Sequence, residues 1–376
     1  MRVYFDNAST TPLIPEVQAE MTRIISEVYG NPSSIHLHGR EARIVVEEAR
    51  KTIATGLNAS SGEIFFTSGA TEANNMAILG SIRDLGVKRI ISTVIEHHCI
   101  LHTLDYIKEH QMAEVILLKV DSKGQIDYDQ LESILGDGIP TLVSVMHGNN
   151  EIGAICDLQR LSDLCEKTGA YLQTDTAQTL AKLPIDLAQT KISFLCGASH
   201  KFFGPKGVGF VYINGDNLIK PMFFGGDQER GMRSGTENIY GIAGMAKAFK
   251  LALAQREQRR KAISAVRNHF EKRLTETLED IKFNSTRDGL YNICSVSFPP
   301  SPKSEMLMMN LDILGISASS GSACSSGAEL DSHVLQAIGH DGKRKTVRFS
   351  FSHLNTLDEV DYVIEKLKTI TPVAAV

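Results

Sequence analysis

Short apolar segments alternate with helical segments through the first two thirds of the chain, and this alternation predicts an α/β fold. Seven of these segments are short and apolar, as strands covered on both faces of a parallel sheet are. Helical segments lie between most of them, as the connections between parallel strands require. We therefore expect a large domain with a mostly parallel seven-stranded sheet and, after it, a smaller α+β domain.

The N-terminal part of the chain precedes the sheet. Residues 1–14 form a polar, turn-rich arm, and Pro15 opens a helix over Glu16–Tyr29, since proline suits the first helical position. A second helix covers Arg40–Leu57. The expected strands are Glu63–Thr67, Lys88–Val94, Glu114–Val120, Thr141–His147, Ala170–Thr174, Lys191–Cys196 and Val208–Ile213. The helices between them are Glu72–Leu85, Ile100–His110, Tyr128–Leu135 and Leu158–Lys167.

The segment from Asn238 to Glu279 favours a helix almost throughout, which is longer than one compact domain usually needs. We place a domain boundary inside it, near Arg256–Arg260. The large domain then covers residues 14–257, and the small domain covers residues 1–13 and 258–376. The small domain is expected to contain strands at Asp280–Phe283, Tyr291–Phe298 and Thr346–Ser350 and helices at Ser304–Leu311, Ala328–Ile338 and Leu357–Ile370.

The composition excludes several classes of protein. The 376 residues are 42% hydrophobic and 22% charged, with a formal net charge of -5, which is ordinary for a soluble enzyme. Basic residues are scattered, so we expect no nucleic-acid partner. No apolar run is long enough to cross a bilayer and the N-terminus lacks a secretory pattern, so we expect no membrane partner and no export. The six cysteines show no paired spacing, which favours the cytoplasm.

Lys201 lies where an apolar strand ends and a glycine-rich turn begins. The strand loses side-chain bulk at Gly197 and Ala198, and Ser199-His200-Lys201 follows. The small neighbours leave room for a bound group, so Lys201 is a candidate to hold an aldehyde cofactor as a Schiff base. A surface lysine in a glycine-rich loop is the more frequent meaning of this pattern, and the other strand ends decide between the two.

Four other strand ends carry residues suited to one cofactor, pyridoxal 5′-phosphate (PLP). The turn Ser68-Gly69-Ala70-Thr71 opens a helix, where backbone N–H groups and a hydroxyl bind phosphate, although a simple helix cap explains this turn equally well. The Asp175 carboxylate suits the pyridine nitrogen, which it would keep protonated. Asn150 and Gln178 suit the phenolic oxygen, and His97 suits stacking on the ring and proton transfer.

These residues stand in motifs that resemble those of the cysteine desulfurases, which belong to the class V aminotransferases of fold type I and supply sulfur for iron–sulfur clusters. The resemblance covers nearly the whole chain. The motifs that carry it are Tyr4-Phe-Asp-Asn-Ala-Ser-Thr-Thr-Pro12, Gly30-Asn-Pro-Ser-Ser34, Phe66-Thr-Ser-Gly-Ala-Thr-Glu-Ala-Asn74, Glu96-His97, His147-Gly-Asn-Asn-Glu-Ile-Gly153, Asp175-Thr-Ala-Gln178, His200-Lys201-x-x-Gly-Pro-Lys-Gly207, Glu229-Arg-Gly-Met-Arg-Ser-Gly-Thr236 and Ser319-Ser-Gly-Ser-Ala-Cys324.

The resemblance implies a role for each candidate residue. Lys201 would carry PLP, Asp175 would meet the pyridine nitrogen, and His97, Asn150 and Gln178 would contact the ring and its substituents. The phosphate would be held by Ala70, Thr71, His200 and, from the partner subunit of a homodimer, Thr236. The family usually has a phosphate-site serine at the position of Ala198, and here Ser199 would take its place. Arg348, helped by Asn31, would clamp the substrate α-carboxylate in the bidentate way that guanidinium allows.

Cys324 lies in the small polar run Ser319–Gly327, where no apolar pattern predicts that the thiol is buried, as most lone cysteines are. In the resembled family this cysteine, as thiolate, attacks the sulfur of the substrate L-cysteine, and alanine leaves. A persulfide stays on the enzyme and passes to a sulfur-acceptor protein, either a scaffold or a relay. The long loop is similar to that of the subclass whose persulfide reaches out to acceptor proteins.

Three alternatives compete with a cysteine desulfurase. A selenocysteine lyase or another class V aminotransferase-like enzyme would keep the fold and the cofactor, although a plain aminotransferase needs no thiol at Cys324. A sulfur relay or scaffold with weak catalysis would not need the set of Lys201, Asp175 and His97. A metal site in Glu96-His97-His98-Cys99 is disfavoured because adjacent residues cannot easily point at one ion.

Overall fold

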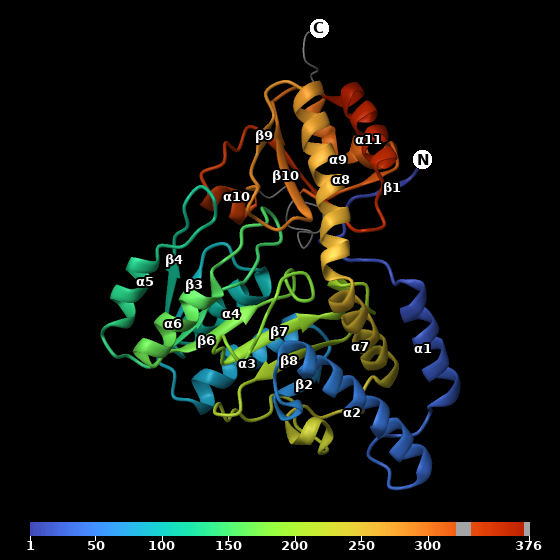
Figure 1. Ribbon diagram of the computed structural model, residues 1–376. Coiled ribbons are helices and arrows are strands. Elements are labelled where there is room, and N and C mark those ends of the chain that lie inside the picture. The colour runs from blue at the N-terminus through green and yellow to red at the C-terminus, as the bar shows by residue number, and fades with distance from the viewer. Residues whose placement is uncertain (321–331, 372–376) are drawn as a thin grey trace.

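The computed structural model describes residues 1–320 and 332–371. Its largest element is a seven-stranded sheet with the strand order β2-β8-β7-β6-β5-β3-β4 (Figure 1). Strands β7, β6, β5, β3 and β4 pair in parallel, whereas β8 is antiparallel to both β7 and β2. The mostly parallel sheet predicted from the sequence is therefore confirmed. In chain order the strands are Ile64–Thr67, Arg89–Thr93, Glu114–Leu118, Thr141–Ser144, Tyr171–Asp175, Phe194–Ala198 and Gly209–Ile213.

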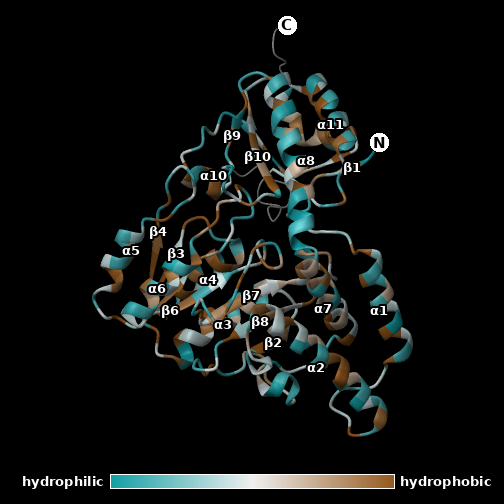
Figure 2. Ribbon diagram, viewed as in Figure 1, coloured by the Kyte–Doolittle hydropathy of each residue, from teal (hydrophilic) through white to brown (hydrophobic). Residues whose placement is uncertain are grey.

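Helices cover both faces of this sheet, which explains why β2, β3, β5, β7 and β8 are buried along their whole length. Helices α3 (Ala70–Asp84) and α4 (His98–Glu109) pack on one face and share a hydrophobic core with it. The other face packs against a second core formed by α1 (Pro15–Glu27), α2 (Leu37–Leu57), α5 (Tyr128–Leu135), α6 (Leu158–Thr168) and α7 (Ile239–Ala254). Figure 2 shows brown, hydrophobic strands between helices that are partly teal.

A separate core lies beyond the large sheet, in the upper part of Figure 1. It contains a three-stranded antiparallel sheet of the order β12-β10-β9, formed by Lys345–Ser350, Ile293–Phe298 and Lys282–Phe283. The helices around it are α8 (Arg256–Thr277), α9 (Leu307–Ile313) and α11 (Leu357–Ile370), and the short α10 (His333–Ala337) lies nearer the large sheet.

The N-terminal arm belongs to this second part of the molecule. Its strand β1 (Val3–Tyr4) pairs in parallel with β11 (Ile316–Ser317). The Asn7 side chain then donates to the carbonyl oxygen of Ser350, 343 residues later in the chain, over 2.9 Å. The arm thus runs between the two cores, and its next residues face the carboxyl ends of the large sheet.

The long helix predicted over Asn238–Glu279 is two helices. Helix α7 ends at Ala254, and α8 begins at Arg256 after Gln255, whose φ of -106° and ψ of 9° are not helical. The sequence predicted one continuous helix because the residues on both sides of Gln255 favour helix. The break lies beside the domain boundary predicted near Arg256–Arg260.

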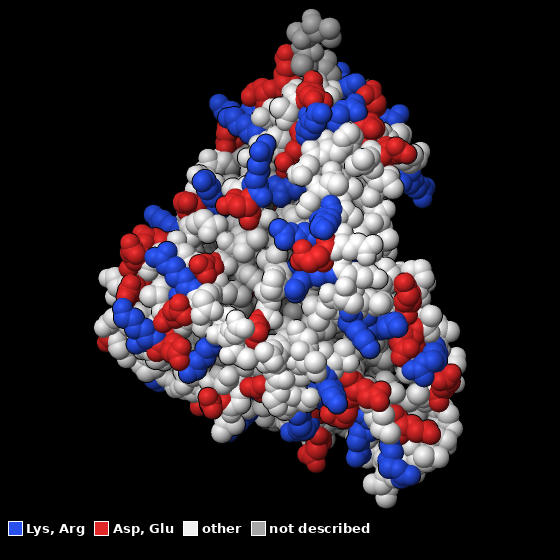
Figure 3. Space-filling model, viewed as in Figure 1, with Lys and Arg blue, Asp and Glu red and all other residues white. Residues whose placement is uncertain are grey.

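Two further observations concern the surface. Within the described residues, no helix combines the length and the apolar character needed to span a membrane. On the face shown in Figure 3, basic and acidic side chains are interspersed, without a large area of one sign.

Candidate active site

A cavity of about 540 Å³ opens where the carboxyl ends of the parallel strands meet. This is where ligands bind in open α/β sheets, and the volume is typical of small-molecule sites. The cavity brings together most of the residues predicted from the sequence, which come from distant parts of the chain. Those that line it are Ala70, Thr71, His97, Asn150, Asp175, Gln178, His200, Lys201 and Arg348.

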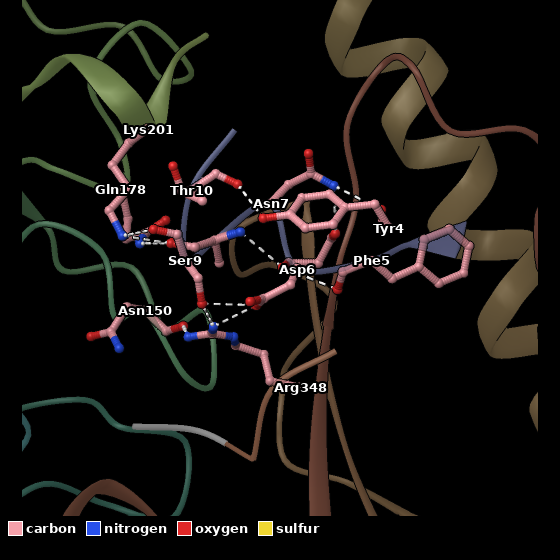
Figure 4. Close-up of polar contacts among 12 residues, drawn as sticks. Tyr4, Phe5, Asp6, Asn7, Ser9, Thr10, Asn150, Gln178, Lys201 and Arg348 are labelled. Carbon is pink, nitrogen blue, oxygen red and sulfur yellow. Dashed lines mark hydrogen bonds and ion pairs between the residues drawn. The ribbon is translucent and has the colours of Figure 1, made fainter. Parts of the chain in front are cut away.

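Lys201 ends the short 3-10 turn Ser199–Lys201 that follows strand β7. Its ammonium donates hydrogen bonds to the carbonyl oxygens of Ala8 (2.7 Å) and Ser9 (2.9 Å). Figure 4 shows Lys201 beside Ser9. The N-terminal arm therefore supplies backbone acceptors that hold the lysine at the edge of the cavity. These two backbone acceptors orient the amine there.

Asp175 is the last residue of β6, on the strand beside β7, and only 6% of its surface is exposed. One carboxylate oxygen accepts from Nδ2 of Asn74 and the other from the backbone N–H of Ala177, both over 2.8 Å. The Asn74 amide is itself held by Nε2 of Gln173 at 2.8 Å. Two hydrogen bonds to the carboxylate fix its orientation at the floor of the cavity.

Gln178 lies one turn further along the chain and points into the same space. Its Nε2 donates to the carbonyl oxygen of Ala8 over 2.9 Å. Its Oε1 is buried and accepts no hydrogen bond from the described residues. Because a buried polar atom without a partner is costly, this oxygen marks a position where a ligand donor would be bound.

The opposite end of the cavity is suited to an anion. Helix α3 begins at Ala70 after Gly69, so its first backbone N–H groups have no partner within the helix and face the cavity with the positive end of the helix dipole. The His200 ring lines the same cavity, and Lys206 adds a positive charge. Burial, with help from Lys201 and Lys206, lowers the pKa of His200 to about 4, so the imidazole is neutral at pH 7.

The structure does not bring every predicted residue to this cavity. Ser199 is fully buried, and a side chain added at Gly204 would lie 2.0 Å from its hydroxyl, so the hydroxyl points under that turn. Ala198 lines the cavity in its place. Asn31 is exposed on another part of the molecule, where its Oδ1 accepts from the backbone N–H of Ser33.

Thr236 and Cys324 need separate mention. Thr236 is exposed and lies outside the cavity, on the segment that follows the turn Gln228–Gly231. That segment is anchored by Glu229, whose Oε2 accepts from the backbone N–H of Phe66 and from Arg50, each at 2.7 Å. Cys324 lies outside the described residues.

His97 caps the N-terminus of α4, with its Nδ1 accepting from the backbone N–H of Cys99 at 3.1 Å. Burial lowers the pKa of His97; the charge of Asp175 opposes this shift, and the charge of Lys201 adds to it. Since Nδ1 is the acceptor, a neutral ring carries its proton on Nε2. The ring lines the cavity and is able to give or take a proton there.

Arg348, on strand β12, is only 2% exposed and reaches the cavity from the second core. Its guanidinium donates to Oδ1 of Asp6 (2.9 Å), the hydroxyl of Ser9 (2.6 Å) and the carbonyl oxygen of Asn150 (2.8 Å), as Figure 4 shows. The positive charge is thus held between the arm and the carboxyl end of β5.

The sequence analysis did not assign Asp6, Ala8 and Ser9 to the site. All three belong to the motif Tyr4–Pro12, which was the available signal. The contacts of Ala8 and Ser9 to Lys201 are made by backbone oxygens, which have no sequence signature.

Glu96 was also missed by the sequence analysis. It is fully buried, and its Oε1 accepts from the Thr93 hydroxyl (2.8 Å) and from the backbone N–H of Met146 (3.0 Å). Burial raises the pKa of Glu96 to about 8.

These groups fit PLP. The cavity offers a lysine for the aldehyde, a fixed carboxylate for the pyridine nitrogen and a helix N-terminus for the phosphate. The partnerless oxygen of Gln178 is a further polar group that a bound ligand would satisfy. Within residues 1–320 and 332–371, no group of three His, Cys, Asp or Glu side chains is placed to hold a metal ion.

Comparison with known proteins agrees with this site. A model of the aminotransferase class-V family matches residues 3–363. The cysteine desulfurase IscS of Dictyoglomus turgidum is 39% identical, over 98% of this chain and 96% of its own. Two solved structures are also similar over nearly all of both chains. One, titled a NifS-like protein, has a TM-score of 0.90, 35% identity and coverage of 98% of this chain and 99% of its own.

The other structure is titled SspA in complex with cysteine. It has a TM-score of 0.81 and 30% identity, and the match covers 95% of this chain and 100% of that one. The likeness thus includes both cores and the arm between them, not the large sheet alone. With the family match over residues 3–363 and the lysine, aspartate and helix N-terminus in one cavity, the chain belongs to the aminotransferase class-V family.

Proposed function

We propose that this protein is a PLP-dependent cysteine desulfurase that converts L-cysteine to L-alanine and leaves a persulfide on Cys324. The observation that carries the proposal is the cavity in which Lys201, Asp175 and Arg348 meet, since it combines a cofactor site with a guanidinium for a substrate carboxylate. The name of the Dictyoglomus relative and the cysteine in the SspA complex support the reaction and the substrate. A selenocysteine lyase is not favoured by these relatives.

Each cavity residue has a role toward the cofactor. Lys201 would bind the aldehyde carbon, and Asp175 would keep the pyridine nitrogen protonated. The N–H groups of Ala70 and Thr71, with neutral His200, would hold the phosphate. Gln178 and Asn150 would contact the ring substituents. When bound, PLP supplies an electron-accepting ring that stabilises negative charge on the substrate carbon.

The remaining residues act on the substrate. Arg348 binds the α-carboxylate, which then competes with Asp6 for the guanidinium. Lys201 and His97, both at the cavity wall, move protons to and from the substrate carbons. The Asn31 assignment stays a prediction, because its contacts in the structure are local.

The sulfur step uses the thiolate of Cys324. It attacks the substrate sulfur, so that an S–S bond forms while the C–S bond breaks. The electron pair of the broken bond stays with the three-carbon fragment, which takes up a proton and leaves as alanine. The persulfide then passes to a sulfur-acceptor protein, in iron–sulfur cluster assembly or in thio-modification, within the cytoplasm.

The functional unit in this proposal is a homodimer, in which Thr236 completes the phosphate site of the partner subunit. Two observations support a role in trans. Thr236 is exposed and outside its own cavity, and Arg233 beside it is fixed to α3 by a 2.8 Å contact with Glu72. The segment is therefore held in place, although no residue of 228–236 is among the described residues that line the PLP cavity of its own subunit.

The test is the reaction of the purified enzyme with cysteine, followed by measurement of alanine and of sulfide released by reductant. Cys324→Ser should retain the PLP absorbance and its change on adding cysteine, but should lose alanine formation, because cofactor and sulfur acceptor are separate groups. Cys156→Ser is the matched control and should behave as wild type, since Cys156 lies outside the cavity. Alanine formation by Cys324→Ser at the wild-type rate would contradict the mechanism.

A further inference from the structure

A second, much smaller cavity of about 30 Å³ lies behind Lys201, on the side away from the PLP site. Lys201 lines both cavities. The walls of the small cavity come from the arm, from α8 and from the segment before β10. Four of its lining residues are cationic, namely Lys182, Lys201, Arg256 and Arg259. None of the described residues that line it is acidic.

Lys182 is the cation most closely tied to the active site. Its ammonium donates to the carbonyl oxygens of Gln178 (2.8 Å) and Lys201 (3.2 Å), the two residues that also face the PLP site. An ammonium carries three donors, so one is left for a ligand. Burial, with the charge of Lys201, lowers the pKa of Lys182 to about 7, which shows that the surroundings disfavour its positive charge.

The same cavity contains polar atoms that lack a partner. Asn292 is 1% exposed, and neither its Nδ2 nor its Oδ1 makes a hydrogen bond within the described part of the chain. The Nε of Arg256 is likewise buried without a hydrogen bond, and its nearest carboxylate, Glu257, is 4.0 Å away. Buried donors without acceptors are rare in folded proteins, so a bound species is expected here.

Size and charge decide what that species is. A volume of about 30 Å³ holds a water molecule or a monatomic anion, because one water needs roughly 10–15 Å³ of such space. Sulfate and phosphate, with five heavy atoms each, do not fit. The acidic residues that act on the lining groups, Glu16 on Arg259 and Glu257 on Tyr291, lie outside the cavity. The carboxylate of Glu257 lies 4.0 Å from Nε of Arg256 but outside the cavity, so no described residue places a negative charge inside it. An anion would supply that charge, whereas a water molecule would not.

We propose that this cavity is a binding site for a monatomic anion of the chloride type, held by Lys182, Arg256 and Asn292 behind the cofactor lysine. The anion accepts from the third donor of Lys182, from Nε of Arg256 and from Nδ2 of Asn292. Because Lys182 also holds the backbone of Gln178 and Lys201, the anion stabilises the wall that separates the two cavities. The site does not depend on which substrate the enzyme uses.

The direct test is a crystal structure of the PLP-loaded enzyme grown in bromide, with data collected at the bromine edge. An anomalous peak beside Lys182, Arg256 and Asn292 is the expected result. A density peak there without anomalous signal would be water, and it would overturn the proposal, as would an empty cavity.

A solution measurement checks the same site without crystals. At equal ionic strength, the thermal midpoint of the PLP-loaded enzyme should be higher in chloride or bromide than in gluconate, which is too large to enter, because a ligand that binds only the folded state raises its stability. Lys182→Met and Asn292→Leu should each weaken halide binding about tenfold or more, since each removes a donor to a charged ligand.

The matched control is Lys191→Met, which removes a surface lysine paired with Glu166 outside this cavity. Its thermal midpoint should be higher in chloride than in gluconate by the same amount as in the wild type. An equal midpoint in chloride and gluconate for the wild type, or a halide effect that survives in both Lys182→Met and Asn292→Leu, would refute the anion site.

Discussion

At the scale of single residues, the site is defined by charges that are already paired before a ligand arrives. Arg348 donates to Asp6, to Ser9 and to the carbonyl oxygen of Asn150. A planar guanidinium makes these contacts in a fixed fork, which an ammonium cannot reproduce. In the proposed mechanism, substrate binding would therefore exchange the Asp6 carboxylate for the substrate carboxylate at a guanidinium whose geometry is already fixed.

Arg348→Lys should raise KM for cysteine roughly ten- to hundredfold, because a bidentate pair between charged groups is lost. The PLP absorbance should change little, since Arg348 is assigned to the substrate carboxylate and not to the cofactor. Steady-state kinetics and an absorbance titration measure the two effects. Arg344→Lys serves as control, because Arg344 pairs with Asp280 and does not line the cavity. An unchanged KM in Arg348→Lys would assign the carboxylate to another residue.

Glu96 makes stability depend on pH. Burial raises the pKa of its carboxyl from 4.5 to about 8, so the folded state keeps the proton where the unfolded state has lost it. The stabilisation from this proton is full below pH 4.5 and is lost as the pH rises towards 8, with a slope of up to about 1.4 kcal/mol per pH unit. The side chain in Glu96→Gln is neutral at every pH, so this variant lacks the pH-dependent contribution of Glu96 to stability.

The free energy of unfolding, measured by urea denaturation at pH 5.5, 6.5 and 7.5, should therefore fall less steeply with pH in Glu96→Gln than in the wild type. A glutamine keeps the acceptor for the Thr93 hydroxyl and the Met146 N–H, so the fold is expected to persist. Parallel pH curves for the two proteins would show that Glu96 is ionised in the folded state.

At the scale of elements, three glycines allow the anion end of the cavity to form. A Cβ on Gly209 of β8 would lie 2.4 Å from the carbonyl oxygen of Gly197 on β7 and 2.7 Å from Cα of Gly69, just before α3. Backbone atoms cannot swing aside as a side chain does. The close approach of β7, β8 and the start of α3 therefore depends on glycine at this position.

Gly209→Ala should push these three elements apart and lower the free energy of unfolding by about 1–3 kcal/mol, as overpacking does. It should also weaken PLP binding, because the N-terminus of α3 moves. Equilibrium unfolding and PLP titration test both effects. Gly215→Ala is the control, since its added Cβ would meet only the Glu63 side chain at 3.7 Å. If Gly209→Ala bound PLP with wild-type affinity, the substitution on β8 would not have displaced the N-terminus of α3.

The sequence predicted the strands better than the helix break. All seven strands of the large sheet were predicted because each lies in a short apolar run between helical segments. Most of these strands are buried, but β4, at the edge of the sheet, is buried only at Leu118. Lys201 and Asp175 were found because parallel strands end at one edge. The direction of the Ser199 hydroxyl depends on packing under Gly204, and the acceptors of Lys201 are backbone atoms, so neither was predictable. The domain boundaries stay a prediction, supported by the separate cores.

At the scale of the whole molecule, the proposed dimer makes one prediction that no single chain can satisfy. Lys201→Ala and Thr236→Ala should each be inactive or weak alone. In a mixed dimer, one site would combine both mutations, and the other would have an intact lysine and an intact threonine from the two subunits. Such heterodimers should regain about half of the wild-type activity per dimer, as one good site of two requires.

The mixed dimers are made by coexpressing the two variants with different affinity tags and purifying over both. A mixture of separately purified homodimers, assayed before subunits exchange, is the control and should stay at the parent level. If the heterodimers also stay at that level, Thr236 serves its own subunit.

The N-terminal arm has a consequence for how the protein is made. Its residues are synthesised more than 300 residues before their partners, strand β11 and Ser350. The helices and strands between Pro15 and Ala254 are near one another in sequence and can fold as they emerge. The carbonyl oxygens of Ala8 and Ser9 can accept from Lys201 only after the arm has paired with β11 and Ser350. Loading of the cofactor into its final geometry is therefore a late event, which requires the prior synthesis of β11 and Ser350.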